Sequence, residues 1–137
     1  MDCRYTASHF WAVEQQTGLW RVGMTKFATR MLGDLVEFEF VAKPGQQVDV
    51  GQTIGWIEAF KALTDLYCVA DGIFIGANPL IEQDISLVDS DPYRKGWLYS
   101  IKGTPEPNNV DVHGYVEILD LAIDKMREQS GNKDGDG

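Results

Sequence analysis

The segment from Gly55 to Tyr67 places one lysine, Lys61, between two short runs of residues that favour β-strands. The strand-forming residues are Ile54, Trp56 and Ile57 before the lysine, and Leu66, Tyr67 and Val69 after it. This pattern predicts a β-hairpin with Lys61 at or near its tip, where a modifying enzyme can reach it. A lysine in such a place is usually only solvated, so its surroundings must decide whether it has a function.

The rest of the first hundred residues also predicts strands, with one short helix among them. Residues 35–41 alternate, with Val36, Phe38 and Phe40 on one side and glutamates on the other, as in a half-buried strand. Thr25 is placed to cap a short helix that Gly33 ends. We therefore expect a mainly β chain, a flattened β-sandwich or barrel with a short internal helix and the lysine at one end.

The last thirty residues have a different pattern. Residues 105–109 have the composition of a linker, and apolar residues then recur at helical spacing, namely Tyr115, Ile118, Leu119, Ala122 and Met126. We expect a C-terminal amphipathic helix that packs on the sandwich, because its mainly acidic polar face disfavours a membrane. Residues 1–129 are predicted to form a single carrier domain, and residues 130–137 a disordered tail.

Size and charge limit the possible functions. A chain of 137 residues has room for one core, and its formal net charge is −9. This acidity argues against nucleic acid and anionic membranes as partners. Cys3 and Cys68 lack the spacing of a metal or redox motif. The N-terminus lacks the apolar run of a signal peptide, so we expect a cytoplasmic location.

Five short motifs occur together in a characteristic order. They are His9-Phe-Trp11, Val22-Gly-Met-Thr25, Leu32-Gly-Asp34-Leu-Val36, Glu58-Ala-Phe-Lys61-Ala62, and Asp91-Pro-Tyr93 followed by Gly96-Trp97-Leu98. From about Ser8 to Lys102 the chain thereby resembles the lipoyl-bearing H-protein family, which is glycine cleavage H protein-like. The resemblance implies a lipoyl-domain-like fold of the hammerhead type, with lipoate bound covalently to Lys61.

The resemblance also implies the roles of two acids. Glu58 and Asp65 would help a lipoate ligase or lipoyl transferase to recognise the hairpin. Biotin is disfavoured as the cofactor, because biotin carriers hold their lysine between two methionines and here the neighbours are Phe60 and Ala62. His9 and His113 have no metal-ligand spacing and no catalytic motif is present, so we expect a non-catalytic cofactor carrier.

Departures from the family pattern bear on the cargo. In the glycine cleavage branch the glutamate of His-Glu-Trp is expected to bind an aminomethyl group, and here that position is Phe10, with Ser8 and Asp65 as polar neighbours. Phe60 and the Tyr67-Cys-Val69 sequence are further departures. The pattern is most similar to the lipoate-binding proteins of bacterial sulfur oxidation, which would make a heterodisulfide-reductase-like complex the partner.

The alternative is an aminomethyl carrier that serves the glycine cleavage enzymes, including dihydrolipoamide dehydrogenase. Two further interpretations remain open. One is an interaction module that has lost its cofactor, and the other is a relay that passes lipoyl groups to other proteins.

Overall fold

The computed structural model describes residues 3–136, with side chains up to residue 128. Nine strands form two antiparallel sheets, and four helices connect or extend them. The strands are β1 (Cys3–Tyr5), β2 (Phe10–Gln16), β3 (Leu19–Met24), β4 (Leu35–Phe40), β5 (Gln47–Val48), β6 (Thr53–Ala59), β7 (Leu63–Tyr67), β8 (Ala70–Ala77) and β9 (Tyr99–Pro105). The helices are α1 (Lys26–Leu32), α2 (Pro79–Gln83), α3 (Leu87–Ser90) and α4 (Val112–Asp136).

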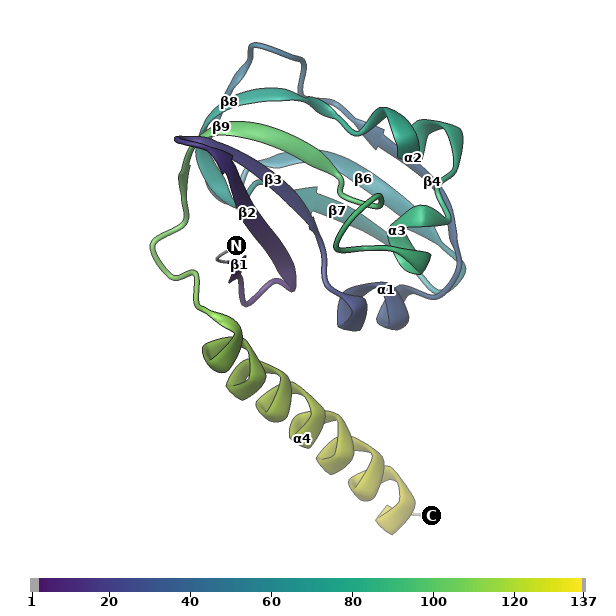
Figure 1. Cartoon of the computed structure of the whole chain (residues 1–137). Coiled ribbons are helices and arrows are strands. Elements are labelled where there is room, and N and C mark those ends of the chain that lie inside the picture. Colours follow the sequence, from purple (N-terminus) through teal and green to yellow (C-terminus); the bar gives the residue numbers. More distant parts are fainter. Residues whose placement is uncertain (1–2, 137) are drawn as a thin grey trace.

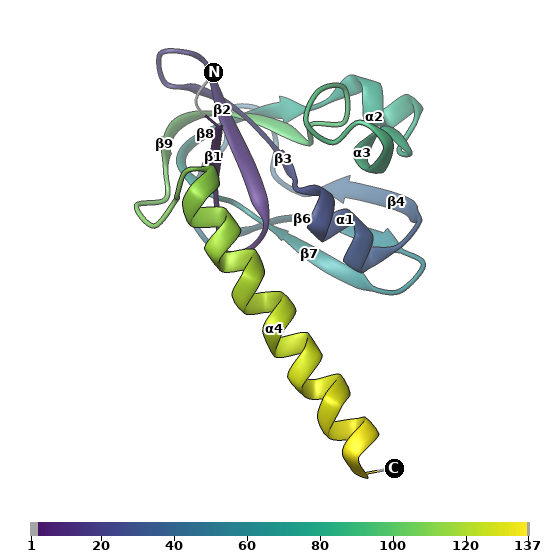
Figure 2. The same cartoon turned by 60° about the horizontal axis from the view of Figure 1, so that its bottom comes forward.

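The larger sheet has six strands in the order β1-β2-β3-β9-β8-β5, and the smaller has three in the order β4-β6-β7. The two sheets lie on either side of the core, with α1, α2 and α3 at one side of the molecule (Figures 1 and 2). Side chains such as Val22, Tyr99 and Ile101 from the larger sheet and Ile57 from the smaller are fully buried between them. The predicted mainly β sandwich, with its internal and C-terminal helices, is confirmed.

The smaller sheet carries the predicted hairpin. Strands β6 and β7 pair in antiparallel register, and residues 60–62 connect them, so Lys61 lies at the tip as predicted. In the described part of the chain, β4 and β7 each pair with β6 alone and therefore form the two edges of this sheet. The prediction for β4 is wrong in one detail, because the side chain of Val36 is 59% exposed. The pairing of β4 with β6 shifts register between Leu35 and Glu37, so Val36 is an extra residue at which the alternation of faces is interrupted.

The short helix α1 has the predicted ends. Thr25 caps it by accepting a hydrogen bond from the Ala28 N–H, and Gly33 ends it with a positive φ of 81°, a conformation that favours glycine. Helices α2 and α3, each of five residues or fewer, were not predicted from the sequence. Such short helices have almost no periodicity to detect, although Asn78 does cap α2 directly before Pro79.

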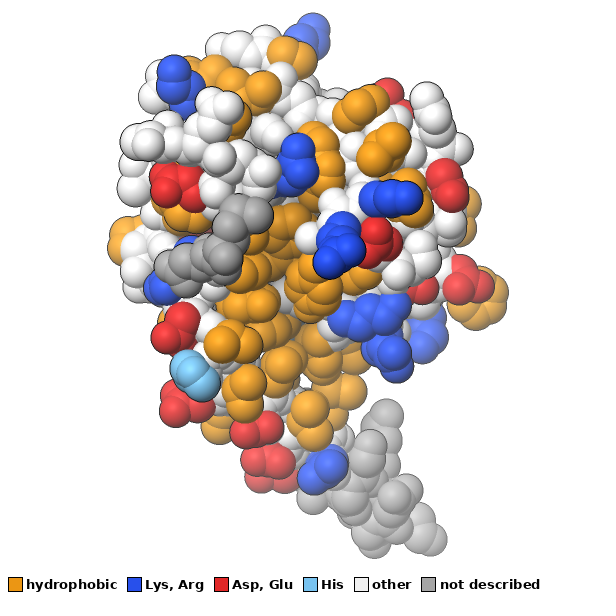
Figure 3. Space-filling view, in the orientation of Figure 1, with side chains coloured by type: hydrophobic (Ala, Val, Ile, Leu, Met, Phe, Trp, Pro, Cys, Tyr) orange, Lys and Arg blue, Asp and Glu red, His pale blue; other side chains and the backbone are white. Residues whose placement is uncertain are grey.

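The C-terminal helix α4 is present, but the prediction that it packs on the sandwich is wrong for most of its length. Its first turns are attached to β1, where the rings of Tyr115 and Tyr5 stack at 4.7 Å. The helix then runs away from the body, and its hydrophobic side chains continue the apolar surface outward (Figures 1 and 3). Leu121 is 72% exposed and Met126 41% exposed. Helical spacing identified the helix but not the surface that would receive it.

The domain division stays a prediction. Helix α4 extends to Asp136 and so includes most of the segment 130–137 for which we expected a tail, whereas Gly137 lies outside the described residues. Within the described chain, no helix is both long and apolar enough to span a bilayer.

Candidate functional site

Lys61 is held at the hairpin tip by main-chain bonds to the segment that joins α1 to β4. The Lys61 N–H donates to the Leu32 carbonyl at 3.1 Å, and the Phe60 N–H donates to the Asp34 carbonyl at 2.8 Å. The tip is closed by the Ala59 N–H, which donates to the Ala62 carbonyl at 2.8 Å. The position of the lysine backbone is therefore fixed by two elements that are distant in sequence.

The side chains of the tip are open to solvent, unlike those at the base of the hairpin. Phe60 is 82% exposed and Leu63 is 70% exposed, whereas Ile57 and Leu66 are buried. The Lys61 stem passes close to Gly33, where an added Cβ would lie 3.4 Å from the lysine Cγ. A rigid, buried base thus presents an accessible amine.

A cleft of about 360 Å³ lies between α1 and the outer edge of β7. We call it the α1 cleft. It is lined mainly by apolar side chains, and its lining residues are Ser8, His9, Phe10, Met24, Phe27, Ala28, Met31, Leu32, Thr64, Asp65, Leu66 and Tyr67. Because Leu32 both lines the cleft and accepts the Lys61 hydrogen bond, the cleft begins beside the root of the lysine.

The cleft brings together three residues that the sequence analysis connected. Phe10, which replaces the family's glutamate, lines it together with Ser8 and Asp65. Phe10 is only 5% exposed, so its ring forms part of the wall. Most of the lining side chains are apolar, and Asp65 is the only carboxylate among them.

Glu58 lies elsewhere. It is exposed on β6, and in the strand register it faces Glu37 on β4 and Leu63 on β7. Trp56 pairs with Asp65 and Glu58 pairs with Leu63, so the two acids lie on the same outer face of the smaller sheet as diagonal neighbours. Of the two, Asp65 on the edge strand β7 also lines the α1 cleft.

His9 lines the cleft and makes structural contacts there. Its Nδ1 lies 2.9 Å from the Tyr115 hydroxyl, which in turn lies 2.7 Å from Thr25 Oγ1. Its φ is +69°, an uncommon value for a residue other than glycine. Burial lowers the pKa of His9, so the neutral imidazole is favoured. These contacts connect α4 to the N-cap of α1 and explain the histidine without catalysis.

Cys68 does not form part of the cleft. Its side chain is 1% exposed, and its Sγ donates to the Ala70 carbonyl at 3.0 Å. Burial also raises the pKa of this thiol, which makes the reactive thiolate less available. These observations favour an inert core cysteine over a reactive thiol.

No group of three or more His, Cys, Asp or Glu side chains in the described residues is arranged to hold a metal ion. The site offers an exposed amine at a fixed position and an apolar cleft beside it. Such an arrangement can carry a covalently attached group and shelter it between encounters with other proteins.

Comparison with known proteins also indicates a protein that carries a covalently attached group. Residues 3–118 match the family model described as "Glycine cleavage H-protein". The chain is 38% identical over 121 residues to the glycine cleavage system H protein of Paraburkholderia phymatum, covering 86% of this chain and 94% of that protein. It is 35% identical to the corresponding protein of Sodalis glossinidius over 121 residues, covering 88% of this chain and 87% of that protein.

Among solved structures, the chain is similar to the crystal structure of a glycine cleavage system H protein from Mycobacterium marinum. The TM-score is 0.76 with 32% sequence identity, over 85% of this chain and 94% of that one. The family model covers the residues of the hairpin, of the α1 cleft and of both sheets, while the residues after 118 lie beyond it.

Proposed function

Because the chain belongs to the glycine cleavage H-protein family, we propose that Lys61 carries its lipoyl group and that the group serves as a swinging arm between partner enzymes. Glycine cleavage H proteins carry lipoate covalently attached to a lysine and are non-catalytic carrier subunits. The chain is accordingly a carrier rather than an enzyme, and lipoate is its cofactor.

The observation that supports Lys61 as the attachment site is its position. It is an exposed amine at the tip of a hairpin whose base is buried and whose tip is bonded to the α1–β4 connection. Lipoylation through an amide would remove one positive charge. The lysine stem and octanoyl chain would together reach about 12–15 Å from the backbone. The reactive sulfurs belong to the cofactor, and the protein supplies position and recognition.

The α1 cleft is the resting place that we propose for this arm. Helix α1 has seven residues, which corresponds to a length of about 10 Å. An arm that starts beside Leu32 can therefore extend along the whole helix. Met31, Phe27 and Tyr67 would cover the apolar chain of the arm, and burial of that chain favours docking.

For the cargo, an aminomethyl group of the glycine cleavage reaction is the leading candidate. The relatives reported above are named glycine cleavage H proteins, and Asp65 gives the cleft one carboxylate for a cationic amine. In this role the glycine cleavage enzymes, among them dihydrolipoamide dehydrogenase, would be the partners. A lipoate ligase or lipoyl transferase would attach the cofactor.

A sulfur-bound intermediate is the second candidate, and one observation favours it. Phe10 forms a wall of the cleft where the family pattern has a glutamate, so an aminomethyl group would meet one carboxylate fewer. The partner would then be a heterodisulfide-reductase-like complex. No relative reported above carries a name from sulfur oxidation, and this assignment therefore ranks below glycine cleavage.

A cytoplasmic location belongs to the same proposal. The buried Cys68 is a thiol, as is usual for cysteines in reducing compartments.

Intact mass with peptide mapping tests the attachment site. We expect the full chain, incubated with a lipoate ligase, ATP and lipoate, to gain one lipoyl group confined to Lys61. The Lys61→Arg variant should gain none, while Lys43→Arg, on a loop outside the site, should be modified like the wild type. A lipoyl group on another lysine, or none in the presence of a ligase shown to be active, would refute the proposal and favour an interaction module.

A further inference from the structure

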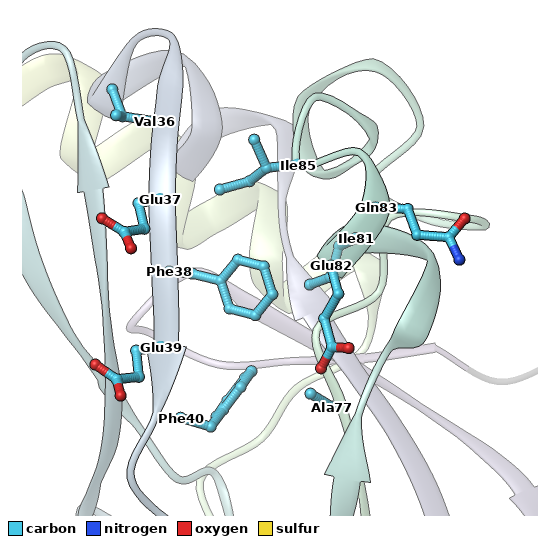
Figure 4. A pocket seen from close by; sticks show the side chains of 10 residues that line it. All are labelled: Val36, Glu37, Phe38, Glu39, Phe40, Ala77, Ile81, Glu82, Gln83 and Ile85. Carbon is cyan, nitrogen blue, oxygen red and sulfur yellow. The ribbon is translucent and has the colours of Figure 1, made fainter.

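The second edge of the smaller sheet borders another hollow. A groove of about 540 Å³ lies between β4 and α2, and we call it the β4 groove. It is lined by Val36, Glu37, Phe38, Glu39, Phe40, Ala77, Ile81, Glu82, Gln83 and Ile85 (Figure 4). Phe38 and Phe40 reach from β4 into the space in front of α2, while Glu37 and Glu39 lie on the opposite side of the strand.

The edge of β4 also offers main-chain hydrogen bonds. The Val41 N–H donates to the Ile54 carbonyl at 2.8 Å, which makes these two residues a hydrogen-bonded pair. Antiparallel pairs alternate, so every second residue along β4 points its N–H and C=O away from β6. By this alternation Phe38 and Phe40 expose their main-chain groups at the edge, where a further strand can pair.

The charged side chains around the groove are all acidic. Glu37, Glu39 and Glu82 are exposed, and no lysine or arginine is among the lining residues. Glu37 also faces Glu58 directly across the β4–β6 register, a like-charge pair that destabilises a sheet. Within the described chain, no salt bridge involves these carboxylates. A basic partner would relieve this repulsion.

We propose that the β4 groove binds an extended, basic segment of the protein that acts on the arm at Lys61. The segment adds as a strand to the edge of β4, with its lysines or arginines toward the glutamates and its apolar side chains toward Phe38 and Phe40. Glu37 and Glu39 are two residues apart, so they lie about 7 Å from each other, the same spacing as alternate residues of an added strand. The identity of the partner, a protein that acts on the arm, rests on the proposed function. The binding of a basic strand to the β4 edge does not.

Two arguments select this occupant. A second copy of the chain would bring the β4 glutamates of both copies together, and each chain carries a net charge of −9. A basic segment instead gains electrostatic attraction and is guided toward the edge. The groove also begins near Lys61. Asp34, directly before β4, accepts a hydrogen bond from the N–H of Phe60, the residue before Lys61. A protein bound along β4 is thereby placed next to Lys61.

The test uses the full, unlipoylated chain labelled with ¹⁵N and the capped peptide Lys-Val-Lys-Val-Lys-Val as the probe. We expect saturable shifts of the amide resonances from Val36 to Phe40 and a Kd that rises at least fivefold in the Glu37→Gln/Glu39→Gln variant. The Glu117→Gln/Asp120→Asn variant, which removes the same charge from exposed positions on α4, should bind like the wild type. The acidic peptide Glu-Val-Glu-Val-Glu-Val should cause no shift.

Equal weakening by both double variants, or shifts scattered over the acidic surface, would show non-specific attraction and overturn the proposal. Shifts in β4 that grow with protein concentration alone would identify a second copy as the occupant and would equally overturn it. A ligase assay then separates the two claims. A wild type that is lipoylated at Lys61 at least fivefold faster than the Glu37→Gln/Glu39→Gln variant supports the groove, and equal rates contradict its role for that enzyme. A wild-type chain that the ligase does not modify would refute the proposed function but not the binding of a basic segment to the β4 groove.

Discussion

The two edges of the smaller sheet border two hollows of different character. Along β7 the α1 cleft is lined mainly by apolar side chains and contains one carboxylate, Asp65. Along β4 the groove beside α2 has an apolar floor but three exposed glutamates, and β4 has an outer edge with which no other described strand pairs. Lys61 lies at the end of the strand pair between them. The difference indicates that one edge is suited to a neutral arm and the other to a charged protein segment.

The largest effect on this comparison is expected from β6, the strand that lies between the two edge strands β4 and β7. Ile57 in β6 is fully buried beneath the sheet. Its replacement by alanine should lower the free energy of unfolding by about 3 kcal/mol, because it removes buried methyl groups and leaves a cavity. Urea unfolding measures this loss. Val36→Ala, at an exposed position on the edge strand, should change the free energy of unfolding by no more than about 0.5 kcal/mol. Similar losses in both variants would contradict the described division between core and edge.

A carboxylate in the α1 cleft would make it more like the β4 groove. Phe10→Glu should lower the free energy of unfolding by about 2 kcal/mol, since a largely buried ring is replaced by a carboxylate with few partners. The same change should increase loading of the lipoylated protein with aminomethyl by a glycine decarboxylase about tenfold, because a charged hydrogen bond contributes about 1.5 kcal/mol or more.

The matched control is Phe10→Gln, which is polar but uncharged and should not increase loading. A wild type that already loads as fast as Phe10→Glu would show that the cargo does not need this carboxylate. A wild type that does not load at all would favour the sulfur-bound cargo.

The smallest effect concerns pH and is confined to the cleft. Burial lowers the pKa of His9 below its ordinary value of 6.5. As pH falls below about 6.5, the unfolded chain therefore binds the proton before the folded chain does, and the free energy of unfolding decreases. His9→Asn, which tolerates the positive φ, should show a smaller decrease between pH 7.5 and pH 5.5 in urea unfolding. A wild-type slope in the His9→Asn variant would contradict the assignment to His9.

Local features of the sequence predicted the parts of the fold that local interactions determine. The Thr25 cap, the helix end at Gly33 and the strand-forming residues around Lys61 all lie within a few positions of what they control. The motifs that resemble those of the H-protein family also predicted the sheet architecture. The grouping of Phe10 with Ser8 and Asp65 was also expected, and the cleft contains all three.

The features that were missed depend on long-range packing. The groove beside β4 forms where α2 packs near the edge of the smaller sheet. No motif in either segment predicts this contact between distant parts of the sequence. The course of α4 was wrong because an apolar stripe does not identify its partner surface. Glu58 and Asp65 share the outer face of the smaller sheet, and only Asp65 also lines the α1 cleft, because α1 packs beside the edge strand β7.

The most direct test of the central claim compares amide spectra of the ¹⁵N-labelled full chain before and after lipoylation. If the arm on Lys61 uses the α1 cleft, shifts should be largest at Met31, Leu32 and Tyr67, with little change along Val36–Phe40. Shifts concentrated in the β4 groove, or limited to the hairpin tip at residues 60–62, would contradict the assignment of the two hollows to the arm and to a partner protein.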